Sequence, residues 1–588
     1  MQRKWKIRPH DSGTIQQVEK TAGVSPVLAH LLVSRGMTDR DQIAHFLDKP
    51  FQSLRAPMLL PGVEVASQRI FDAIKGGERI CIYGDYDADG MTSTAILVRC
   101  INLLGGNVTY FVPSRLDDGY GLNDDSLQKV KKDGAQLVVT VDCGIASVHE
   151  AETCKRLEMD LIITDHHQWG EQLPDAVAIV HPALPGHDYP FAGLCGAGVA
   201  LKLAWALCQR ASDNDKVSEA HRNYLLLALG LAAIGTVADV VPLQDENRLI
   251  VAHGLAFLRH ETVVGMQELI KLNKLEHKPS LTAEDIGFCL APRLNAAGRL
   301  GQAQLGVELL TTDSAKRAKD LADYIHQLNS SRESLERRIQ KAANKMIAEQ
   351  HLQDEPALVL ASRDWHKGVI GIVAGRIAEK YHRPTVLIAQ EEVAGGKPAV
   401  GSGRTACGVN LYEALHACAQ HLETCGGHRA AAGLRVSDDK IDSFRDALCE
   451  YVSENTEPSD FEASLKVDME VPLSHLTMQT LNDMEKLAPF GMENRRPIFC
   501  SCGVKLTAPP KKIGGGERHL SLQLIQQDIR MRAVAFGGGE WADQLDWETG
   551  VFDFAYKPII NEFRGRRNVE LQIIDWRKSE VASELVKN

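Results

Sequence analysis

The chain has 588 residues, with 66 Lys or Arg against 77 Asp or Glu, so its formal net charge is −11. Hydrophobic residues make up 44% and charged residues 24%, an ordinary globular composition that excludes a fibrous or wholly disordered protein. The acidic balance excludes a uniformly basic coat for nucleic acid, but it leaves room for a local basic groove because steering depends on the local field.

The cysteines and apolar runs predict a reduced, cytoplasmic protein. None of the 13 cysteines forms a Cys-x-x-Cys pair, and the closest two are Cys500 and Cys502, so we expect free thiols. The basic N-terminus is not followed by an apolar core, which argues against a secretory signal. The longest uncharged apolar run, 223–238, is shorter than the roughly 20 residues of a membrane span, so we expect a buried helix there.

Short apolar runs alternate with helix-length segments after a helical lead-in over residues 1–64. We expect strands at 79–83, 107–112, 137–141 and 161–164, with helices at 91–103 and 124–133. This alternation predicts a parallel sheet with helices on both faces, in a domain that spans residues 65–275. The near-continuous apolar character of the strands fits burial on both faces.

A helical linker is predicted over residues 276–355. The segment 313–355 contains no Pro or Gly, and its apolar residues recur every three, four or seven positions. This spacing predicts a long amphipathic helix, either unbroken or with a slight break near 329–331, capped by Asp313 or Ser314. The helix either joins two lobes or is an ordinary bundle helix.

The rest of the chain predicts two further domains. Residues 356–455 read as a second α/β domain, with strands at 357–361 and 386–389 and a helix at 369–381. Residues 456–588 carry short strand-like runs and the turn signals 509–510, 514–516 and 537–539, which predict a small β domain. The fold class is therefore α/β, with a parallel-sheet domain, a long helix, a second α/β domain and a C-terminal β-barrel.

Acidic side chains follow the predicted strands of the first domain. Asp85-Tyr86-Asp87-Ala88-Asp89-Gly90, Asp142-Cys143-Gly144 and Asp165-His166-His167 follow three strands, and Asp239 ends a helical run. Ligands bind outside the carboxyl ends of strands in open α/β sheets, so these side chains are expected to converge. One Asp alone would be a turn residue or helix cap, but clustered carboxylates disfavour ionisation unless a cation compensates, so their joint occurrence favours a metal site.

The ligand types indicate which metal this site holds. Carboxylates with one or two imidazoles suit Mg²⁺ or Mn²⁺, and several carboxylates allow two ions bridged by one Asp. Such a pair activates water and stabilises a leaving oxygen in phosphoester hydrolysis. A structural Ca²⁺ loop of the EF-hand type is the alternative, but it needs Glu at loop position 12, where this sequence has Ile96.

Together these motifs resemble the DHH phosphoesterase family. Asp87-x-Asp89, Asp142, Asp165-His166-His167 and Asp239 are similar to its ordered motifs, and residues 426–433 resemble the glycine-rich motif of its accessory domain. The chain length, the long linker and the extra β domain resemble the bacterial members that degrade single-stranded DNA from its 5′ end.

The resemblance implies a set of catalytic residues. The metal ligands would be Asp87, Asp89, Asp142, His166 and Asp239. Asp142 would bridge two ions, and His167 would lie behind the ligands or near the scissile phosphate. Tyr83 stands where many family members have a His, which favours the long exonucleases and bears on the occupancy of one metal position.

Several residues are candidates for holding phosphate groups. They are Arg115, Arg293, Arg299, Ser402, Arg404, His428 and Arg429. The planar fork of Arg donates to two phosphate oxygens at once, although a single Arg is more often a solvated or salt-bridged residue. A closed pocket of Arg115, Arg299, Ser402 and Arg404 would recognise a 5′-phosphate. The glycines at 426–427 precede a helix-like alanine run whose first N–H groups could bind an anion; the alternative is a glycine-rich turn packed on a sheet.

The β domain carries a basic stretch. Between Arg495 and Arg532 lie eight basic residues and two acidic ones, with Phe499, His519 and Phe536 among them. Basic grooves with stacking rings hold single strands in oligonucleotide-binding (OB) folds, so we expect an OB-like barrel. The alternative is a basic solvated face.

The site residues suggest phosphoester hydrolysis, and the resemblance implies a metal-dependent 5′→3′ exonuclease that degrades single-stranded DNA to 5′-mononucleotides in recombination and repair. The resemblance implies a single-strand-binding protein and a helicase as partners, and nothing requires more than a monomer. Two alternatives remain: a DHH enzyme acting on short oligonucleotides or cyclic dinucleotides, and a DNA-binding factor with an inactive core.

Overall fold

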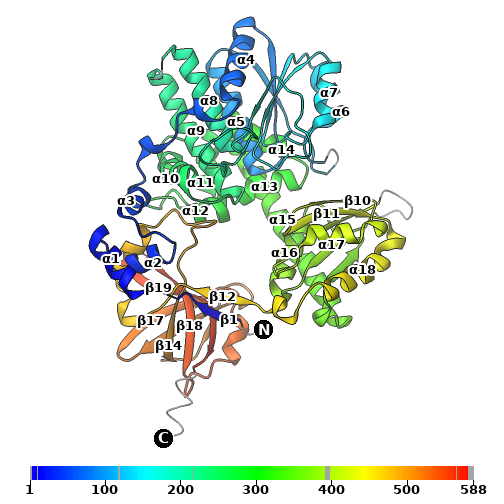
Figure 1. Cartoon of the computed structure of the whole chain (residues 1–588). Helices are drawn as coiled ribbons and strands as arrows, with labels where there is room; N and C mark the ends of the chain where they lie inside the picture. The colour runs from blue at the N-terminus through cyan, green and yellow to red at the C-terminus, as the bar shows by residue number, and fades with distance from the viewer. Residues whose placement is uncertain are drawn as a thin grey trace. The chain divides into compact units, whose positions relative to one another are not determined.

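The computed structural model describes residues 3–9, 11–116, 119–214, 216–390, 398–563 and 566–579. The chain divides into two compact units (Figure 1). The larger consists of Phe51–Phe461 with Gly491–Glu493. The smaller combines Met1–Pro50 with Glu462–Phe490 and Asn494–Asn588, so the two ends of the chain fold together.

The larger unit begins with the predicted parallel sheet. Its strands run in the order β3-β2-β4-β5-β6, all parallel. Their bounds are β2 (Arg79–Tyr83), β3 (Asn107–Phe111), β4 (Leu137–Val141), β5 (Asp160–Thr164) and β6 (Ala178–Val180). Ile80 and Ile82 pack into one hydrophobic cluster, whereas Cys81 and Tyr83 pack into another on the opposite face. Burial on both faces accounts for the continuous apolar strands.

Helices cover both faces of this sheet and continue beyond it (Figure 1). Their bounds are α4 (Val63–Gly76), α5 (Ala88–Leu103), α6 (Asp124–Lys132), α7 (Val148–Arg156), α8 (Gly196–Ser212), α9 (Glu219–Ala238), α10 (Asp245–His260), α11 (Val264–Leu272), α12 (Ala283–Asp285), a π-helical turn (Ile286–Leu290), α13 (Ala291–Arg299) and α14 (Ala303–Thr311). The apolar run 223–238 lies in α9, as predicted for a buried helix. Among the described residues, no helix is both long and apolar enough to cross a membrane.

The long helix α15 (Ala315–Glu349) is unbroken, and the Ser314 side chain caps its start. Leu321 and Ile325 belong to the core of the first domain, whereas Ile339 and Ala343 belong to the core of the next. The helix therefore links two hydrophobic cores. No break occurs near 329–331, where the buried side chains of Asn329, Arg332 and Glu336 bind one another along the helix.

A mixed sheet follows α15, in the order β10-β11-β9-β8-β7. Its elements are β7 (Leu358–Ser362), α16 (Ile370–Tyr381), β8 (Thr385–Ala389), β9 (Ala399–Arg404), α17 (Leu411–Ala417), β10 (Thr424–Gly427), β11 (Ala431–Val436) and α18 (Ile441–Glu454). The prediction of a helix after the glycine pair 426–427 is wrong, because β10 and β11 form an antiparallel hairpin there. Gly427 has φ 141°, and the alanines alternate between the two faces of a strand, which favours the glycine-rich turn.

The smaller unit is built around the predicted OB-like barrel. The ring closes through the pairings β14–β18–β19–β17–β16–β14. Its strands are β12 (Ser464–Val467), β13 (Met469–Glu470), β14 (Phe499–Leu506), β15 (Lys511–Ile513), β16 (His519–Gln526), β17 (Ile529–Ala535), β18 (Phe552–Phe563) and β19 (Arg566–Lys578), with α19 (Met478–Glu485) between β13 and β14.

The N-terminal segment packs on this barrel. It comprises β1 (Lys4–Ile7), α1 (Ser12–Ala22), α2 (Pro26–Val33) and α3 (Arg40–Asp48). Strand β1 pairs in parallel with β12, and Leu28, Leu31 and Leu32 are buried in the same cluster as the barrel core. The segment predicted as a lead-in thus completes the C-terminal domain up to Pro50.

Candidate metal centre

The acidic residues gather at the carboxyl edge of the parallel sheet, where backbone N–H groups fix two of them. Asp87 is the N-cap of α5, and its Oδ1 accepts hydrogen bonds from the N–H groups of Asp89 (2.9 Å) and Gly90 (3.0 Å). Asp89 is fully buried, and its two oxygens accept from Gly196 N (2.7 Å) and Ala197 N (2.9 Å) at the start of α8. A helix N-terminus stabilises such a carboxylate through its free N–H groups and its dipole.

The other acids come from separate elements. Asp142 follows β4 with a left-handed φ of 63°, and its N–H donates to Thr164 O (3.0 Å) on β5. Asp239 is the C-cap of α9, and the next residue, Val240, has φ 61°. A β-branched residue is strained in that conformation, so the chain holds Asp239 at an energetic cost.

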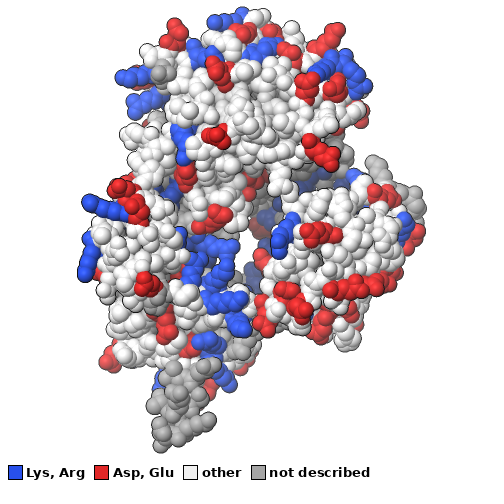
Figure 2. Space-filling model, in the orientation of Figure 1, with Lys and Arg blue, Asp and Glu red and all other residues white. Residues whose placement is uncertain are grey.

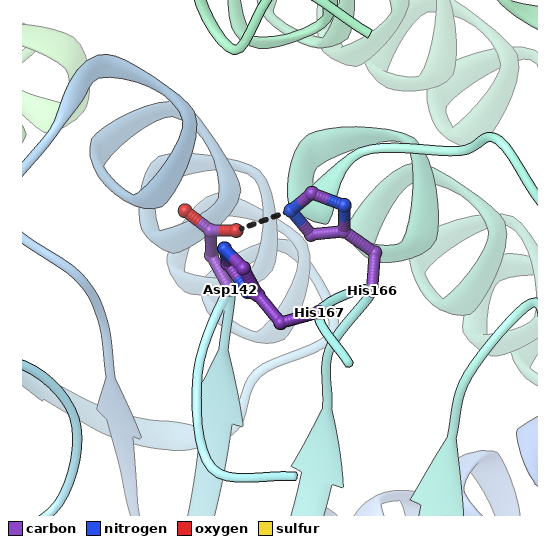
Figure 3. A group of neighbouring side chains, drawn as sticks. All are labelled: Asp142, His166 and His167. Atoms are coloured by element: carbon purple, nitrogen blue, oxygen red, sulfur yellow. Dashed lines mark ion pairs between the residues drawn. The ribbon is translucent and has the colours of Figure 1, made fainter. Parts of the chain in front are cut away.

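The His166 imidazole points into the carboxylates. Its Nε2 lies 3.1 Å from Asp142 Oδ1, 3.6 Å from Asp239 Oδ2 and 3.9 Å from Asp89 Oδ2. Figure 3 shows Asp142 at the end of one strand, with His166 and His167 at the end of its neighbour. The six residues predicted to be catalytic therefore converge from separate segments of the chain.

Three groups of potential ligand atoms, each within 4.8 Å, overlap in this cluster. They are Asp85/Asp87/Asp142, Asp142/His166/His167 and Asp89/His166/Asp239. Asp142 and His166 each belong to two groups. A site built this way has room for two ions that share a ligand.

Burial and mutual repulsion disfavour the charged carboxylates. Burial first, and then the charge of Asp87, raises the pKa of Asp89 to about 6. Burial, and then Asp89, raises the pKa of Asp239 to about 8. Burial and the neighbouring acids place the pKa values of Asp142 and Asp85 well above the ordinary range. A bound cation would restore the charged forms.

The two histidines have opposite environments. Burial, and then the charge of His167, lowers the pKa of His166 to about 3, so its imidazole is neutral and available as a ligand. Burial alone would lower the pKa of His167, but the hydrogen bond from its Nδ1 to Asp165 Oδ1 (2.8 Å) outweighs that effect and raises it to about 9. His167 is therefore a cation at neutral pH.

The residues present fit a divalent metal. Asp85 Oδ1 is buried without a hydrogen-bond partner in the described part of the chain, and the buried Asp142 Oδ1 and His166 Nε2 form an ion pair but no hydrogen bond. Buried polar atoms are normally satisfied, so oxygen and imidazole acceptors without hydrogen bonds are suited to binding a cation. Oxygen-rich donors with one imidazole match Mg²⁺ or Mn²⁺.

Three neighbours of the centre were not among the predicted site residues. Asp85 is buried and belongs to one of the three ligand groups. Asp165 orients both histidines through hydrogen bonds. The Tyr120 hydroxyl lies 3.1 Å from His167 Nδ1 and 3.2 Å from Asp142 O. Asp165 Oδ1 accepts from His166 N (2.7 Å) and His167 N (3.2 Å), and its Oδ2 accepts from Ile145 N (2.9 Å). Asp85 and Asp165 stand in the same sequence motifs as the predicted ligands, whereas no sequence pattern indicates Tyr120.

Four predicted phosphate holders lie close to one another. The Arg115 guanidinium is 5.0 Å from the ring centre of Tyr86, and Arg299 Nη1 donates to Gly368 O (3.5 Å). Arg404 Nη1 donates to Ser402 Oγ (3.2 Å). Burial, and then the charge of Arg115, lowers the pKa of Arg299 to about 10 and also lowers the pKa of Arg404. No carboxylate among the described residues forms a salt bridge with these three guanidiniums, so a half-buried positive cluster is left for an anion.

The other three candidates lie elsewhere in the larger unit. Arg293 bonds to His326 Nδ1 (3.2 Å) and Cys289 O (2.5 Å). His428 and Arg429 form the exposed turn of the β10–β11 hairpin, where Arg429 Nη2 donates to Gly408 O (3.3 Å). The structure brings none of these three into the arginine cluster through a described contact.

Some basic residues of the stretch 495–532 in the barrel form ion pairs within the protein. Arg532 and Lys512 pair with Glu570 (3.4 Å) and Asp543 (3.3 Å). Phe536 is 61% exposed and contacts His519 edge-on, whereas Phe499 is fully buried in the barrel core and cannot stack on a base. Figure 2 shows Lys and Arg gathered over part of the smaller unit, which contains the barrel.

Comparisons with known proteins agree with this organisation. Residues 79–234 match the N-terminal domain of the DHH family, residues 354–454 the DHHA1 domain and residues 467–575 the RecJ OB domain. The single-stranded-DNA-specific exonuclease RecJ of Bacillus subtilis is 37% identical over 98% of this chain and 71% of its own length. The protein of the same name from Escherichia coli is 34% identical over 95% of this chain and 97% of its own length.

Solved structures resemble the whole chain. RecJ from Thermus thermophilus in complex with Mn²⁺ superposes with a TM-score of 0.81 at 30% identity, over 98% of this chain and 80% of that one. Its complex with Mg²⁺ gives a TM-score of 0.73 at 28% identity, over 98% of this chain and 79% of that one. The chain belongs to the RecJ family of single-stranded-DNA-specific exonucleases, a branch of the DHH phosphoesterases.

Proposed function

We propose that this chain degrades single-stranded DNA from its 5′ end to 5′-mononucleotides, in recombination and repair, with two Mn²⁺ or Mg²⁺ ions. One observation carries the proposal: three overlapping ligand groups share Asp142 and His166 at the carboxyl edge of the sheet. The names of the relatives, single-stranded-DNA-specific exonucleases, supply the substrate class.

Asp87, Asp89, Asp142, His166 and Asp239 would hold the ions, with Asp142 as the shared ligand. When bound, the ions supply an activated water and neutralise phosphate charge. Asp165 holds both histidines in place, and the neutral His166 keeps a lone pair for coordination. His167, with its Nδ1 hydrogen-bonded to Asp165, would present Nε2 to the phosphate and stabilise the charge that builds up there.

Arg115, Arg299, Ser402 and Arg404 would bind the terminal 5′-phosphate. Water adds to the phosphorus of the next diester, and the bond from phosphorus to the 3′ oxygen of the terminal nucleotide breaks. The product is a 5′-mononucleotide, and the shortened strand carries a new 5′-phosphate that the same arginines can bind. Arg293, His428 and Arg429 would contact the strand further from the cut.

The barrel would hold the downstream strand through basic residues and the exposed ring of Phe536. We further propose a cytoplasmic monomer whose partners are a single-strand-binding protein and a helicase. The proposed domains are 1–64, 65–275, 276–355, 356–455 and 456–588, supported by family matches at 79–234, 354–454 and 467–575.

The test uses four DNA substrates: a single strand with a 5′-phosphate, one with a blocked 5′ end, one with a blocked 3′ end, and a blunt duplex. Each is incubated with Mn²⁺, Mg²⁺ or chelator, beside an Asp142→Ala variant. We expect mononucleotides only from single strands with a free 5′ end, only with metal, and none from the variant. Strands that are bound but remain intact would contradict the proposal.

The 5′-phosphate pocket is tested by Arg404→Gln. Losing a hydrogen bond to a charged group costs roughly 1.5–3 kcal/mol, or about 10- to 100-fold in kcat/KM on a 5′-phosphorylated strand. The loss should be much smaller on a 5′-hydroxyl strand. The matched control is Arg435→Gln, an exposed residue of the neighbouring strand β11, which should leave both rates unchanged.

A further inference from the structure

We propose that Glu470, Cys500 and Cys502 form a second metal site in the C-terminal barrel, for a thiophilic divalent ion of the Zn²⁺ class. A carboxylate oxygen and the two sulfur atoms lie within 4.8 Å of one another. The site belongs to the smaller unit, so it is separate from the acidic cluster in sequence, in fold and in ligand chemistry.

The strand register places Glu470 beside Cys500. β13 and β14 are parallel, and Glu470 is the direct partner of Cys500. Cys502 lies two residues further along β14, at a β-bulge between Ser501 and Val504 that shifts the pairing of β14 with β18. Backbone pairing therefore sets Glu470 beside Cys500, and the bulged strand brings the sulfur of Cys502 within 4.8 Å of both ligand atoms.

Hydrogen bonds around the three residues hold their backbone in place. Val471 N donates to Cys500 O (2.8 Å), and Ser501 Oγ donates to Val471 O (2.6 Å). Gln526 joins the same segments, because its Nε2 donates to Cys502 O (2.8 Å) and its Oε1 accepts from Leu473 N (2.7 Å). A preformed backbone lowers the ordering cost of binding an ion.

The donor set selects the class of ion. Two thiolates with a carboxylate suit Zn²⁺, whereas Mg²⁺ and Mn²⁺ prefer oxygen ligands. Zn–S bonds of about 2.3 Å and Zn–O bonds of about 2.1 Å put tetrahedral ligand atoms roughly 3.3–3.8 Å apart, so small side-chain rotations would complete the site.

Burial leaves one side of the site open. Cys500 is fully buried against Leu465, Val467 and Ala555, Cys502 is half-buried, and Glu470 is exposed on the short strand β13. Water can supply the fourth ligand from that side. The ion would cross-link β13 to β14 and stabilise the barrel.

The experiment titrates the reduced, chelator-stripped full chain with Co²⁺ in excess Mg²⁺, and the sulfur-dependent absorption separates thiolate-bound Co²⁺ from Co²⁺ in the acidic cluster. We expect a sulfur-to-metal charge-transfer absorption that saturates with one thiolate-bound Co²⁺ per chain and is displaced by Zn²⁺. Glu470→Gln, an exposed change that spares the fold, should weaken Co²⁺ binding at least tenfold. Cys500→Ser with Cys502→Ser should abolish the band, and Cys425→Ser, a half-buried thiol elsewhere, should leave it unchanged.

The proposal is overturned if the charge-transfer band is absent. It is also overturned if Glu470→Gln binds Co²⁺ as tightly as the unchanged chain. A Cys500–Cys502 disulfide in protein isolated without reductant and resistant to mild reduction overturns it as well. Nuclease activity in Mn²⁺ is measured in parallel, and its loss or retention does not bear on this result.

Discussion

Asp165 illustrates how much of the centre depends on a residue that binds through others. Its two oxygens accept four hydrogen bonds, three of them from the adjacent histidines. We expect Asp165→Asn to lower kcat/KM roughly 10- to 100-fold, because groups that orient metal ligands typically carry that effect. The pKa of His167, raised to about 9 by this contact, should fall as well.

The measurement for Asp165→Asn is the pH profile of single-strand cleavage, together with an NMR titration of His167. Asp160→Asn is the matched control, since Asp160 opens the same strand and pairs with Arg69 at the surface (2.7 Å). An unchanged rate and an unchanged His167 titration would show that Asp165 has no positioning role.

The acidic cluster also makes stability and metal binding depend on pH. The pKa values of Asp89 and Asp239, about 6 and about 8, exceed the ordinary 3.8, so the metal-free folded state binds more protons than the unfolded chain. Their contribution to stability is complete below pH 3.8 and is lost as pH rises through 6 and then 8. Metal binding requires the deprotonated acids, so it strengthens over the same range.

We therefore expect the increase in Tm on adding Mn²⁺ to grow from pH 6 to pH 8. Thermal unfolding with and without Mn²⁺ at the two pH values measures it. Asp142→Asn should show little shift at either pH. If Mn²⁺ raises the Tm of the unchanged chain equally at pH 6 and pH 8, then Asp89 and Asp239 are already ionised without metal.

At the scale of elements, the position of Asp89 depends on how closely α9 packs against α5 and α8. A Cβ at Gly235 would lie 2.3 Å from Asp89 Oδ1 and 2.6 Å from Ala197 Cβ. We expect Gly235→Ala to destabilise the protein by about 1–3 kcal/mol, since overpacking forces side chains out of place. Displacing Asp89 should also weaken Mn²⁺ binding.

Calorimetric unfolding and Mn²⁺ titration of Gly235→Ala give the two readouts. Gly287→Ala is the control, because its Cβ would meet only Val237 Cγ1, at an ordinary 3.7 Å. If Gly235→Ala matches this control in both stability and Mn²⁺ affinity, the close packing behind Asp89 is not what positions it.

At the scale of the whole molecule, the two ends of the chain depend on each other. Leu28, Leu31 and Leu32 of α2 are fully buried in the barrel cluster. Each buried Leu contributes about 1.5–3 kcal/mol, a large part of a typical domain's stability. We expect deletion of residues 3–50 to unfold the barrel while the larger unit keeps its metal centre.

Limited proteolysis of the deletion variant, with mass spectrometry of the fragments, tests this dependence. The barrel should become sensitive to protease, and cleavage of short strands in Mn²⁺ should persist with weaker binding of long ones. A protected barrel in the deletion variant would mean that residues 466–579 fold without the N-terminal segment.

The sequence alone predicts the features that local chemistry determines. Apolar runs predict β2, β4 and β5 almost to the residue, and helical spacing predicts α15, because these patterns need only neighbouring residues. The motifs also predict which acids and histidines gather, since parallel strands deliver their carboxyl ends to one edge. The free thiols and the domain types follow from composition and the family motifs.

Only the tertiary structure decides what depends on packing between distant segments. Local pattern predicts a helix after Gly427, but pairing with β9 and β10 makes the alanine run a strand. Phe499 is aromatic among basic residues, yet the barrel core buries it. The sharing of Asp142 and His166 between ligand groups, and the joining of the N-terminal helices to the barrel, arise from long-range contacts. Burial, side-chain direction and close approach are properties of the folded chain, and no short window of sequence contains them.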